Sequence, residues 1–132
     1  MYTRLLVTGS RHVADKMLVY DGIREVLCSV GYSEEMGEDF SDLIVAQGGA
    51  TGADSFAVEF CHKKGIQCVT YEAQWDKFGK AAGIMRNEYM FDDFDPDIVI
   101  AFPLGEWRES RGTFHMITYA FNNSKCAIHI FR

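Results

Sequence analysis

The chain has 132 residues, a formal net charge of -6 at pH 7 and 48 % apolar residues, so we expect one globular domain over residues 1–132 with a core of its own. The acidic balance argues against a general nucleic-acid binder, which normally carries a basic face, but it does not exclude a small phosphate-bearing ligand. No apolar run approaches the roughly 20 residues of a membrane span, and the first residues do not resemble a signal peptide, so we expect a cytoplasmic protein with no membrane partner.

Residues 5–7 form a short, continuous apolar run, which is typical of a strand buried on both faces of a parallel sheet. The run ends in Gly9, Ser10 and Arg11, which places a first loop at the carboxyl end of that strand. From residue 13 to about residue 31, apolar positions recur every three or four residues and indicate one face of a helix. An acidic connection at residues 34–39 follows.

A second apolar run, residues 43–46, leads into the glycine-rich stretch at residues 48–54, Gly-Gly-Ala-Thr-Gly-Ala-Asp. The pattern beyond this stretch predicts a helix that ends at Gly65, with Asp54 in its first turn and lysines in its last. A carboxylate in the first turn stabilises a helix by about 0.3 to 1 kcal/mol through the helix dipole. This purely structural role for Asp54 stays open beside a functional one.

Residues 67–71 form a third strand, and a loop that contains Trp75 leads from it to a helix near residue 82. Ala82, Met85 and Tyr89 are the predicted inward stripe of that helix. The two polar residues Arg86 and Asn87 then lie off the main core stripe and near the beginning of the helix.

Residues 97–102 form a fourth strand that ends at Pro103, and the polar loop at residues 104–111 follows it. Gly112 and Thr113 open a last helix, which has an apolar side formed by Phe114, Ile117 and Phe121. Residues 126–130 complete the sheet as a fifth strand.

The cysteines stand at spacings that match no metal or redox motif. A structural zinc site needs four ligands in close pairs. We therefore expect reduced thiols and no bound metal. The cysteines are Cys28, Cys61, Cys68 and Cys126.

Five strands that alternate with four helices predict a single Rossmann-like α/β domain, with helices on both faces of a parallel sheet. We expect a three-layer α/β/α arrangement with the strand order 3-2-1-4-5. In this order the second, first and fourth strands are neighbours, so the loops at their carboxyl ends meet. The sequence therefore predicts one site built from residues 9–11, 48–54 and 103–113.

The glycine-rich stretch stands where a strand passes into a helix. Glycines allow a ligand to approach the backbone, and the first N–H groups of a helix have no intrahelical partners, so an anion such as phosphate is the natural ligand. Gly48, Gly49, Ala50, Thr51 and Gly52 are the candidate phosphate-binding residues. The alternative is that the glycines only form a tight turn.

The glycine spacing is not that of the dinucleotide fingerprint, and it follows the second strand instead of the first. A Walker A loop is absent too, because Gly79-Lys80 lacks the upstream glycine and the following Ser or Thr. Classical NAD-dependent dehydrogenation and ATP hydrolysis are therefore disfavoured. Two predicted helix N-termini remain, at Gly52 and at Gly112-Thr113, and together they can hold one phosphate or bracket two.

Arg11 and Arg86 are the cationic candidates, because guanidinium groups match phosphate oxygens, and a surface salt bridge is the alternative for both. Trp75 either stacks on a base or packs against a helix edge. Arg108 and Arg111 alternate with glutamates, as in a solvated loop, although such a loop can fold over a ligand.

Together these motifs resemble the YspA-like branch of the SLOG superfamily. The resemblance covers nearly the whole chain, and the superfamily is a Rossmann-like group related to the Lonely Guy cytokinin-activating phosphoribohydrolases and to the DprA recombination mediators, with phage-encoded members. It implies a SLOG-type domain that binds nucleotides or nucleotide-derived molecules. The motifs that carry it are Gly9-Ser10-Arg11, residues 48–54, Trp75 with residues 79–83, residues 86–90, residues 101–103 and Gly112-Thr113.

The resemblance implies phosphate at Gly48 to Gly52 and at Gly112-Thr113, and it places Arg86 at the catalytic arginine of the Lonely Guy enzymes. Those enzymes carry a glutamate within a few residues after their Gly-Thr, and this chain has Phe-His-Met there instead. Asp54, Glu88 or His115 would have to supply the missing acid or base.

We expect from these observations a protein that binds a nucleotide or an ADP-ribose-like molecule, in a sensing, sequestering or processing role and without a cofactor. The alternative is a hydrolase that cleaves the N-glycosidic or phosphate bond of a nucleotide, with Arg86, Asp54 and Glu88 as catalytic residues. A DprA-like, DNA-associated protein is a second alternative, which the net negative charge disfavours. A homo-oligomer also stays open, because oligomers are common in the superfamily.

Overall fold

The structure is a computed structural model, and it describes residues 1–32, 39–123 and 126–132. The acidic connection predicted at residues 34–39 therefore lies, apart from Asp39, outside the described residues. The strands of the described part form one sheet: β1 (Thr3–Gly9), β2 (Leu43–Gln47), β3 (Gln67–Thr70), β4 (Ile98–Phe102) and β5 (Ala127–Ile130). The helical elements are α1 (Lys16–Ser29), α2 (Ala53–Lys64), α3 (Trp75–Phe78), the 3-10 turn η2 (Gly79–Ala81), α4 (Ala82–Phe94) and α5 (Arg111–Asn123).

The sheet is parallel throughout, and its order β3-β2-β1-β4-β5 confirms the predicted order. β1 lies at the centre, where Leu5 pairs with Val45 of β2 on one side and with Ile98 of β4 on the other. The strands β1, β2 and β4 are mostly buried on both faces. Each of them therefore contains a continuous apolar run in the sequence.

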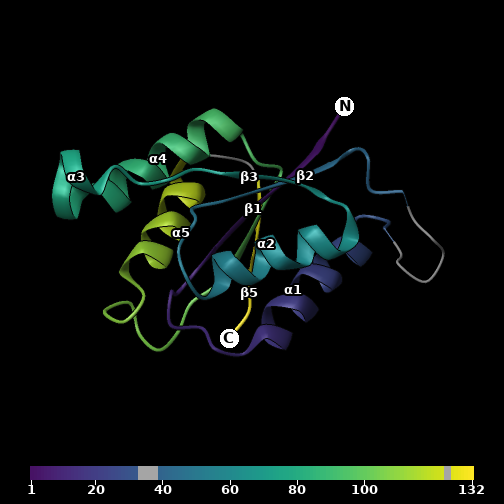
Figure 1. Ribbon diagram of the computed structural model, residues 1–132, viewed down its shortest axis with the longest axis horizontal. Coiled ribbons are helices and arrows are strands. Elements are labelled where there is room, and N and C mark those ends of the chain that lie inside the picture. The colour runs from purple at the N-terminus through teal and green to yellow at the C-terminus, as the bar shows by residue number, and fades with distance from the viewer. Residues whose placement is uncertain (33–38, 124–125) are drawn as a thin grey trace.

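Helices cover both faces of the sheet, as Figure 1 shows, in the predicted three-layer arrangement. α1 and α2 pack on one face over a core that includes Leu5 and Val7, and α4 and α5 pack on the other over Leu6. Successive residues of β1 thus feed the two cores alternately, because side chains alternate across a strand. No described helix is long and apolar enough to cross a membrane.

α1 begins at Lys16, three residues later than the expected start at residue 13. The side chain of Asp15 accepts a hydrogen bond from the Leu18 N–H at 3.2 Å and so caps the helix. Val13 is buried before the helix begins, so its apolar character belongs to the loop after β1.

The prediction of which face of α4 is buried is wrong. Ala82 is buried as expected, but Met85 is 44 % exposed and Tyr89 is 63 % exposed. The observed buried face of the helix carries Asn87 and three larger apolar residues, Met90, Phe91 and Phe94. Both stripes recur every three or four residues, and the one with the larger apolar surface faces the sheet.

α5 differs from the prediction in a similar way. It begins at Arg111, and its buried face consists of Thr113, Met116 and Ala120. The predicted apolar side faces away from the core near the C-terminal end of the helix, since Phe121 is 77 % exposed there. Small residues on the buried face allow this helix to approach β1 and β4 closely. Trp75, which was expected in a loop, opens the short helix α3 instead.

Candidate functional site

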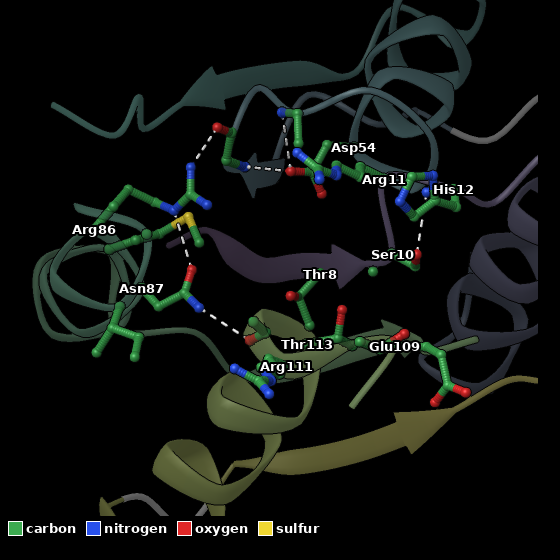
Figure 2. A pocket seen from close by; sticks show the side chains of 18 of the residues that line it. Thr8, Ser10, Arg11, His12, Asp54, Arg86, Asn87, Glu109, Arg111 and Thr113 are labelled. Atoms are coloured by element: carbon green, nitrogen blue, oxygen red, sulfur yellow. Dashed lines mark hydrogen bonds between the residues drawn. The ribbon is translucent and has the colours of Figure 1, made fainter. Parts of the chain in front are cut away.

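A pocket of about 700 Å³ lies at the carboxyl ends of β1 and β2 and beside the N-terminus of α5. This is the place where an open parallel sheet binds its ligands. Four stretches supply its lining: the end of β1 with the following loop, the glycine-rich loop with Asp54, the segment from α3 to α4, and residues 108–113. Figure 2 shows the side chains of this pocket.

Most of the predicted binding residues line this pocket, and they come from all three predicted loops. Those in the lining are Gly9, Ser10, Arg11, Gly48, Ala50, Asp54, Trp75, Arg86, Asn87, Gly112 and Thr113. Other predicted residues are not part of the lining, and these are Gly49, Thr51, Gly52, Pro103 and Glu88.

The N–H groups of the glycine-rich loop are hydrogen bonded within the protein. One carboxylate oxygen of Asp54, Oδ2, accepts from the Gly48 and Ala50 N–H groups at 3.2 Å each, as the dashed lines in Figure 2 show. The N–H of Gly49 donates to Oε1 of the fully buried Gln47 at 2.6 Å. The carboxylate of Asp54 thus holds the position that an anion would take in such a loop.

Asp54 itself is only 5 % exposed. Burial raises the pKa of its carboxyl group to about 6, against the opposing effects of the Ala50 N–H, the positive charge of Arg86 and the Gly48 N–H. Its second oxygen, Oδ1, is buried and has no hydrogen-bond partner in the described part of the chain. Asp54 therefore does more than complement the dipole of α2.

Gly52 provides close contact between two loops. Its φ is +76°, and a Cβ atom at this position would lie 2.5 Å from the carbonyl oxygen of Ser10. The N–H of Ala53, the first residue of α2, donates to the same carbonyl at 3.3 Å. The Thr51 hydroxyl donates to the carbonyl of Arg11 at 3.3 Å. The contacts of Thr51, Gly52 and Ala53 thus hold the loop after β1 against the start of α2.

Arg86 connects α4 to the glycine-rich loop. Its Nη1 donates to the carbonyl oxygens of Gly48 at 2.5 Å and Tyr71 at 3.2 Å, and its Nε donates to Oδ1 of Asn87 at 3.0 Å. Burial lowers the pKa of the guanidinium group, while the charge of Asp54 opposes that shift, and an arginine stays protonated in either case. Much of this guanidinium is therefore engaged with the protein itself.

Asn87 extends the connection to α5. The Nδ2 of Asn87 donates to the carbonyl of Gly112 at 3.0 Å, so its amide stands between Arg86 and the start of α5 (Figure 2). The side chain is 4 % exposed, and its position on the buried face of α4 follows from these two satisfied bonds. The chain of hydrogen bonds joins the predicted phosphate-binding loops to each other.

Glu88 and His115 pair with each other and lie outside the pocket lining. The Nε2 of His115 and Oε2 of Glu88 are 3.1 Å apart, across the contact between α4 and α5. Neither residue is thereby placed to act on a ligand in the pocket.

Further basic residues line the pocket beside Arg11. They are Lys80, Arg108 and Arg111, and none of the four forms an ion pair with another described residue. The guanidinium groups of Arg108 and Arg111 lie 5.6 and 5.5 Å from the ring centre of Trp107. The sequence signal for these arginines was weak, because alternation with glutamates is also typical of a solvated loop.

The N-terminus of α5 presents backbone donors to the same pocket. Ser110 precedes the helix, and its carbonyl accepts the first bond of the helix, from the Phe114 N–H at 2.9 Å. The N–H groups of Gly112 and Thr113 donate to no residue in the described ranges. Thr113 and Thr8 also line the pocket, and neither hydroxyl has a hydrogen-bond partner in those ranges.

The part of the lining that α3 and α4 supply includes apolar side chains beside Arg86 and Asn87. Trp75 is 58 % exposed and Ile84 is 49 % exposed, although both line the pocket. A Cβ atom on Gly83 would lie 3.2 Å from the Trp75 ring, so this glycine allows the indole to pack against α4. In the described ranges, no three His, Cys, Asp or Glu side chains gather in a way that can hold a metal ion.

Comparison with known proteins identifies relatives of this chain. Residues 3–78 match the model of the YspA, cpYpsA-related SLOG family. The chain is also 34 % identical over 122 residues to the Gene 61 protein of Mycobacterium phage D29, an alignment that covers 89 % of this chain and 87 % of the phage protein. The matched segment contains β1, the glycine-rich loop and Trp75. The chain therefore belongs to the YspA, cpYpsA-related SLOG family.

Proposed function

We propose that the pocket binds a nucleotide or a nucleotide-derived molecule of the ADP-ribose kind, in a sensing, sequestering or processing role. Membership of the SLOG family suggests nucleotide-related ligands in general. The observation that carries the proposal is a pocket of about 700 Å³ lined by basic side chains without ion pairs in the described part of an acidic protein. A pocket of this size suits a ligand as large as a nucleotide.

The phosphate end of the ligand lies on the side of α5 in this proposal. Arg108 and Arg111 supply guanidinium groups there, and the N–H groups of Gly112 and Thr113 point from a helix N-terminus. Arg11 adds a third guanidinium group to the lining, from the loop after β1. The Gly48 and Ala50 N–H groups are less suitable, since a phosphate there would have to displace the carboxylate of Asp54.

The ring of the ligand lies against α3 and α4. Trp75 offers a flat aromatic surface, and Ile84 offers an apolar one beside it. Stacking of a base on an aromatic side chain contributes about 1 to 3 kcal/mol in single-stranded nucleic-acid complexes. A nucleotide thus finds an anion-binding part and an aromatic part in one pocket.

The direct test is calorimetric titration of the protein with nucleoside mono- and diphosphates, ADP-ribose, NAD and cyclic nucleotides. We expect at least one of them to bind with a stoichiometry near one. Arg111→Glu should abolish that binding, because it places a carboxylate among the phosphate oxygens. Arg132→Glu is the control, since Arg132 is another arginine of the chain but does not line the pocket. Absence of binding to every compound would refute the proposal.

Hydrolysis of the bound ligand is the second candidate, and Asp54 is the observation that favours it. A carboxyl group with a pKa of about 6 in a ligand pocket is poised to act as a general acid or base near neutral pH. Release of free base or of ribose phosphate, followed by chromatography, tests this candidate. Turnover that survives in Asp54→Asn would rule out the role of Asp54 in it.

A further inference from the structure

The position of Asp54 suggests what its free oxygen is for. Two backbone N–H groups hold Oδ2 in place, so the orientation of the carboxylate is fixed before any ligand arrives. Oδ1 is buried without a partner among the described residues, and Figure 2 shows that Asp54 lies on the side of the pocket formed by the glycine-rich loop. A buried acceptor without a donor costs free energy, which a suitable donor on a ligand recovers.

The kind of donor follows from the surroundings. A phosphate group has no donor to offer at neutral pH, and it would be repelled by the carboxylate. Because Asp54 is only 5 % exposed, a single small group reaches it more easily than a ring does. Hydroxyl groups are small, and they donate to carboxylates in short, strong hydrogen bonds.

The order of groups along a nucleotide agrees with this placement. Its sugar lies between the base and the phosphate, and besides its apolar and basic residues the pocket lining includes polar groups that can bind sugar hydroxyls, among them the Asp54 carboxylate and the hydroxyls of Thr8 and Thr113. The aromatic part at Trp75 and the basic part at Arg111 are then left for the two ends of the ligand.

We propose that Asp54 accepts a hydrogen bond from a ribose hydroxyl of the ligand, so that the glycine-rich loop recognises the sugar instead of the phosphate. This inference rests on the proposed function, because it names the part of a nucleotide-type ligand that meets Asp54. It predicts that the pocket distinguishes ribonucleotides from deoxyribonucleotides.

The test begins with the unaltered protein. Calorimetry compares the best-binding ribonucleotide with its 2′-deoxy and 3′-deoxy forms and with a form that lacks the exocyclic amino group of the base. We expect one of the two deoxy forms to bind about 10- to 100-fold more weakly, since a hydrogen bond to a charged group is lost. The change in the base should have little effect.

Asp54→Asn gives the second arm. An asparagine can accept the loop N–H groups with its oxygen, and it then presents a donor to the pocket where the aspartate presents an acceptor. Discrimination between the ribose and deoxyribose forms should therefore disappear in this variant. Asp97→Asn is the matched control, because the Asp97 carboxylate also accepts a backbone N–H, from Arg4 at 2.8 Å, but Asp97 does not line the pocket. This control should keep the discrimination.

Two different failures can be told apart. If ribose and deoxyribose forms bind equally well to the unaltered protein, or if only the amino group of the base matters, the role of Asp54 is wrong and the nucleotide-binding function stands. If none of the nucleotides binds, the proposed function itself fails. The comparison on the unaltered protein decides the question even if Asp54→Asn does not fold.

Discussion

Asp54 holds the glycine-rich loop in its conformation and also lines the pocket. Its carboxylate accepts the Gly48 and Ala50 N–H groups, and this fixes the glycine-rich turn without any ligand. The same carboxylate is buried and has a pKa raised to about 6. The protein thus keeps an ionised group at neutral pH in a place where burial disfavours the charge, which is typical of functional sites.

We predict a pH effect on stability that belongs to this one residue. The pKa of Asp54 is about 6 in the folded protein and about 3.9 in an unfolded chain. The folded state therefore holds the proton more tightly, so the contribution of Asp54 to stability is greatest below about pH 4 and is lost as the pH rises through 6. The groups around it that carry or can acquire charge are Arg86 and Cys68.

Urea unfolding of the unaltered protein and of Asp54→Asn from pH 4 to pH 8 measures this effect. The free energy of unfolding of the unaltered protein, minus that of the variant, should fall by on the order of 2 to 3 kcal/mol over this range. Subtracting the free energy of unfolding of the variant removes the contributions that the other carboxylates make in both proteins. A difference that is independent of pH would contradict the raised pKa.

Arg86 and Asn87 show what sequence can and cannot reveal about single residues. Their place in a site was predictable, because two polar residues follow Gly83 near the start of a helix that faces the sheet edge. Their partners were not predictable, because Gly48 and Gly112 are distant from them along the chain and the contacts arise only when the helices pack. The sequence did not show that Asp54 occupies the loop N–H groups either, because a carboxylate in the first turn of a helix equally fits a role that only complements the helix dipole.

The side chain of Asn87 links helix α4 to the start of helix α5. We predict that Asn87→Asp lowers the free energy of unfolding by about 1 to 3 kcal/mol, because a carboxylate cannot donate to the Gly112 carbonyl and the two acceptors then face each other. Asn123→Asp is the matched control. Its Nδ2 also donates to a backbone carbonyl, that of Tyr119 at 2.9 Å, but at the exposed end of α5.

Chemical denaturation of both variants provides the measurement. The loss for Asn123→Asp should stay within about 0.5 kcal/mol, as is usual for exposed positions. Equal losses in the two variants would mean that the bond to Gly112 has no particular importance for the packing of α4 against α5.

The two ends of α2 allow a test of the contact between loops. Gly52 precedes the helix and Gly65 follows it, and both have a positive φ, of +76° and +70°. A Cβ atom on Gly52 would lie within 2.6 Å of the backbone of Arg11, whereas a Cβ atom on Gly65 meets nothing within 4 Å. Gly65→Ala should thus cost only the backbone strain, about 1 to 2 kcal/mol.

Gly52→Ala should cost more than about 3 kcal/mol, because the ψ of Gly52, -126°, lies outside the left-handed helical region that Gly65 adopts, and because the alanine would also collide with the backbone. Thermal or urea unfolding of the two variants compares them directly. If the two alanines destabilise the protein to the same extent, the close approach of the β1 loop to α2 is not needed for stability.

The sequence pattern predicted the end of one helix correctly but not the buried faces of two others. Helix α2 was predicted well, because Gly65 adopts the left-handed conformation that commonly ends a helix. The buried faces of α4 and α5 were not, because apolar residues surround both helices and more than one stripe has helical spacing. Met85 and Tyr89 of α4 are exposed on one such stripe, and Met90 and Phe94 are buried on the other.

For the whole molecule, the sheet order and the edge of the sheet at which the pocket lies were predictable together. The three inner strands β1, β2 and β4 are buried and contain continuous apolar runs, and right-handed crossovers leave few ways to arrange the five strands of the sheet. The order β3-β2-β1-β4-β5 then brings the loops after β1, β2 and β4 to one edge. What the order does not specify is the distribution of charge, since the basic residues of the pocket come from separate stretches of an acidic chain.

The charge distribution leads to a prediction about binding. Lys80 lines the pocket and Lys77, on α3, does not. Lys80→Glu should weaken binding of a nucleoside diphosphate about tenfold at low salt, because a positive charge in the pocket that attracts the anionic ligand is replaced by a negative one. Lys77→Glu, with the same change in net charge, should have a much smaller effect.

Calorimetry at two salt concentrations completes this comparison. The effect of Lys80→Glu should shrink as salt increases, because screening reduces interactions between exposed charges beyond about 10 Å at 0.1 M salt. If the two variants weaken binding equally, only the net charge matters and the basic lining of the pocket does not.

In the proposed function, a nucleotide-type ligand occupies this pocket with its ring near α3. The chain has two tryptophans, so Trp107→Phe leaves Trp75 as the only source of tryptophan fluorescence and keeps an aromatic ring beside Arg108 and Arg111. Titration of this variant with the nucleotide panel, followed by the emission of Trp75, tests the claim most directly. We predict a saturable change with at least one nucleotide or ADP-ribose and none with ribose 5-phosphate, which has no base. An emission that stays unchanged throughout the panel would contradict the claim.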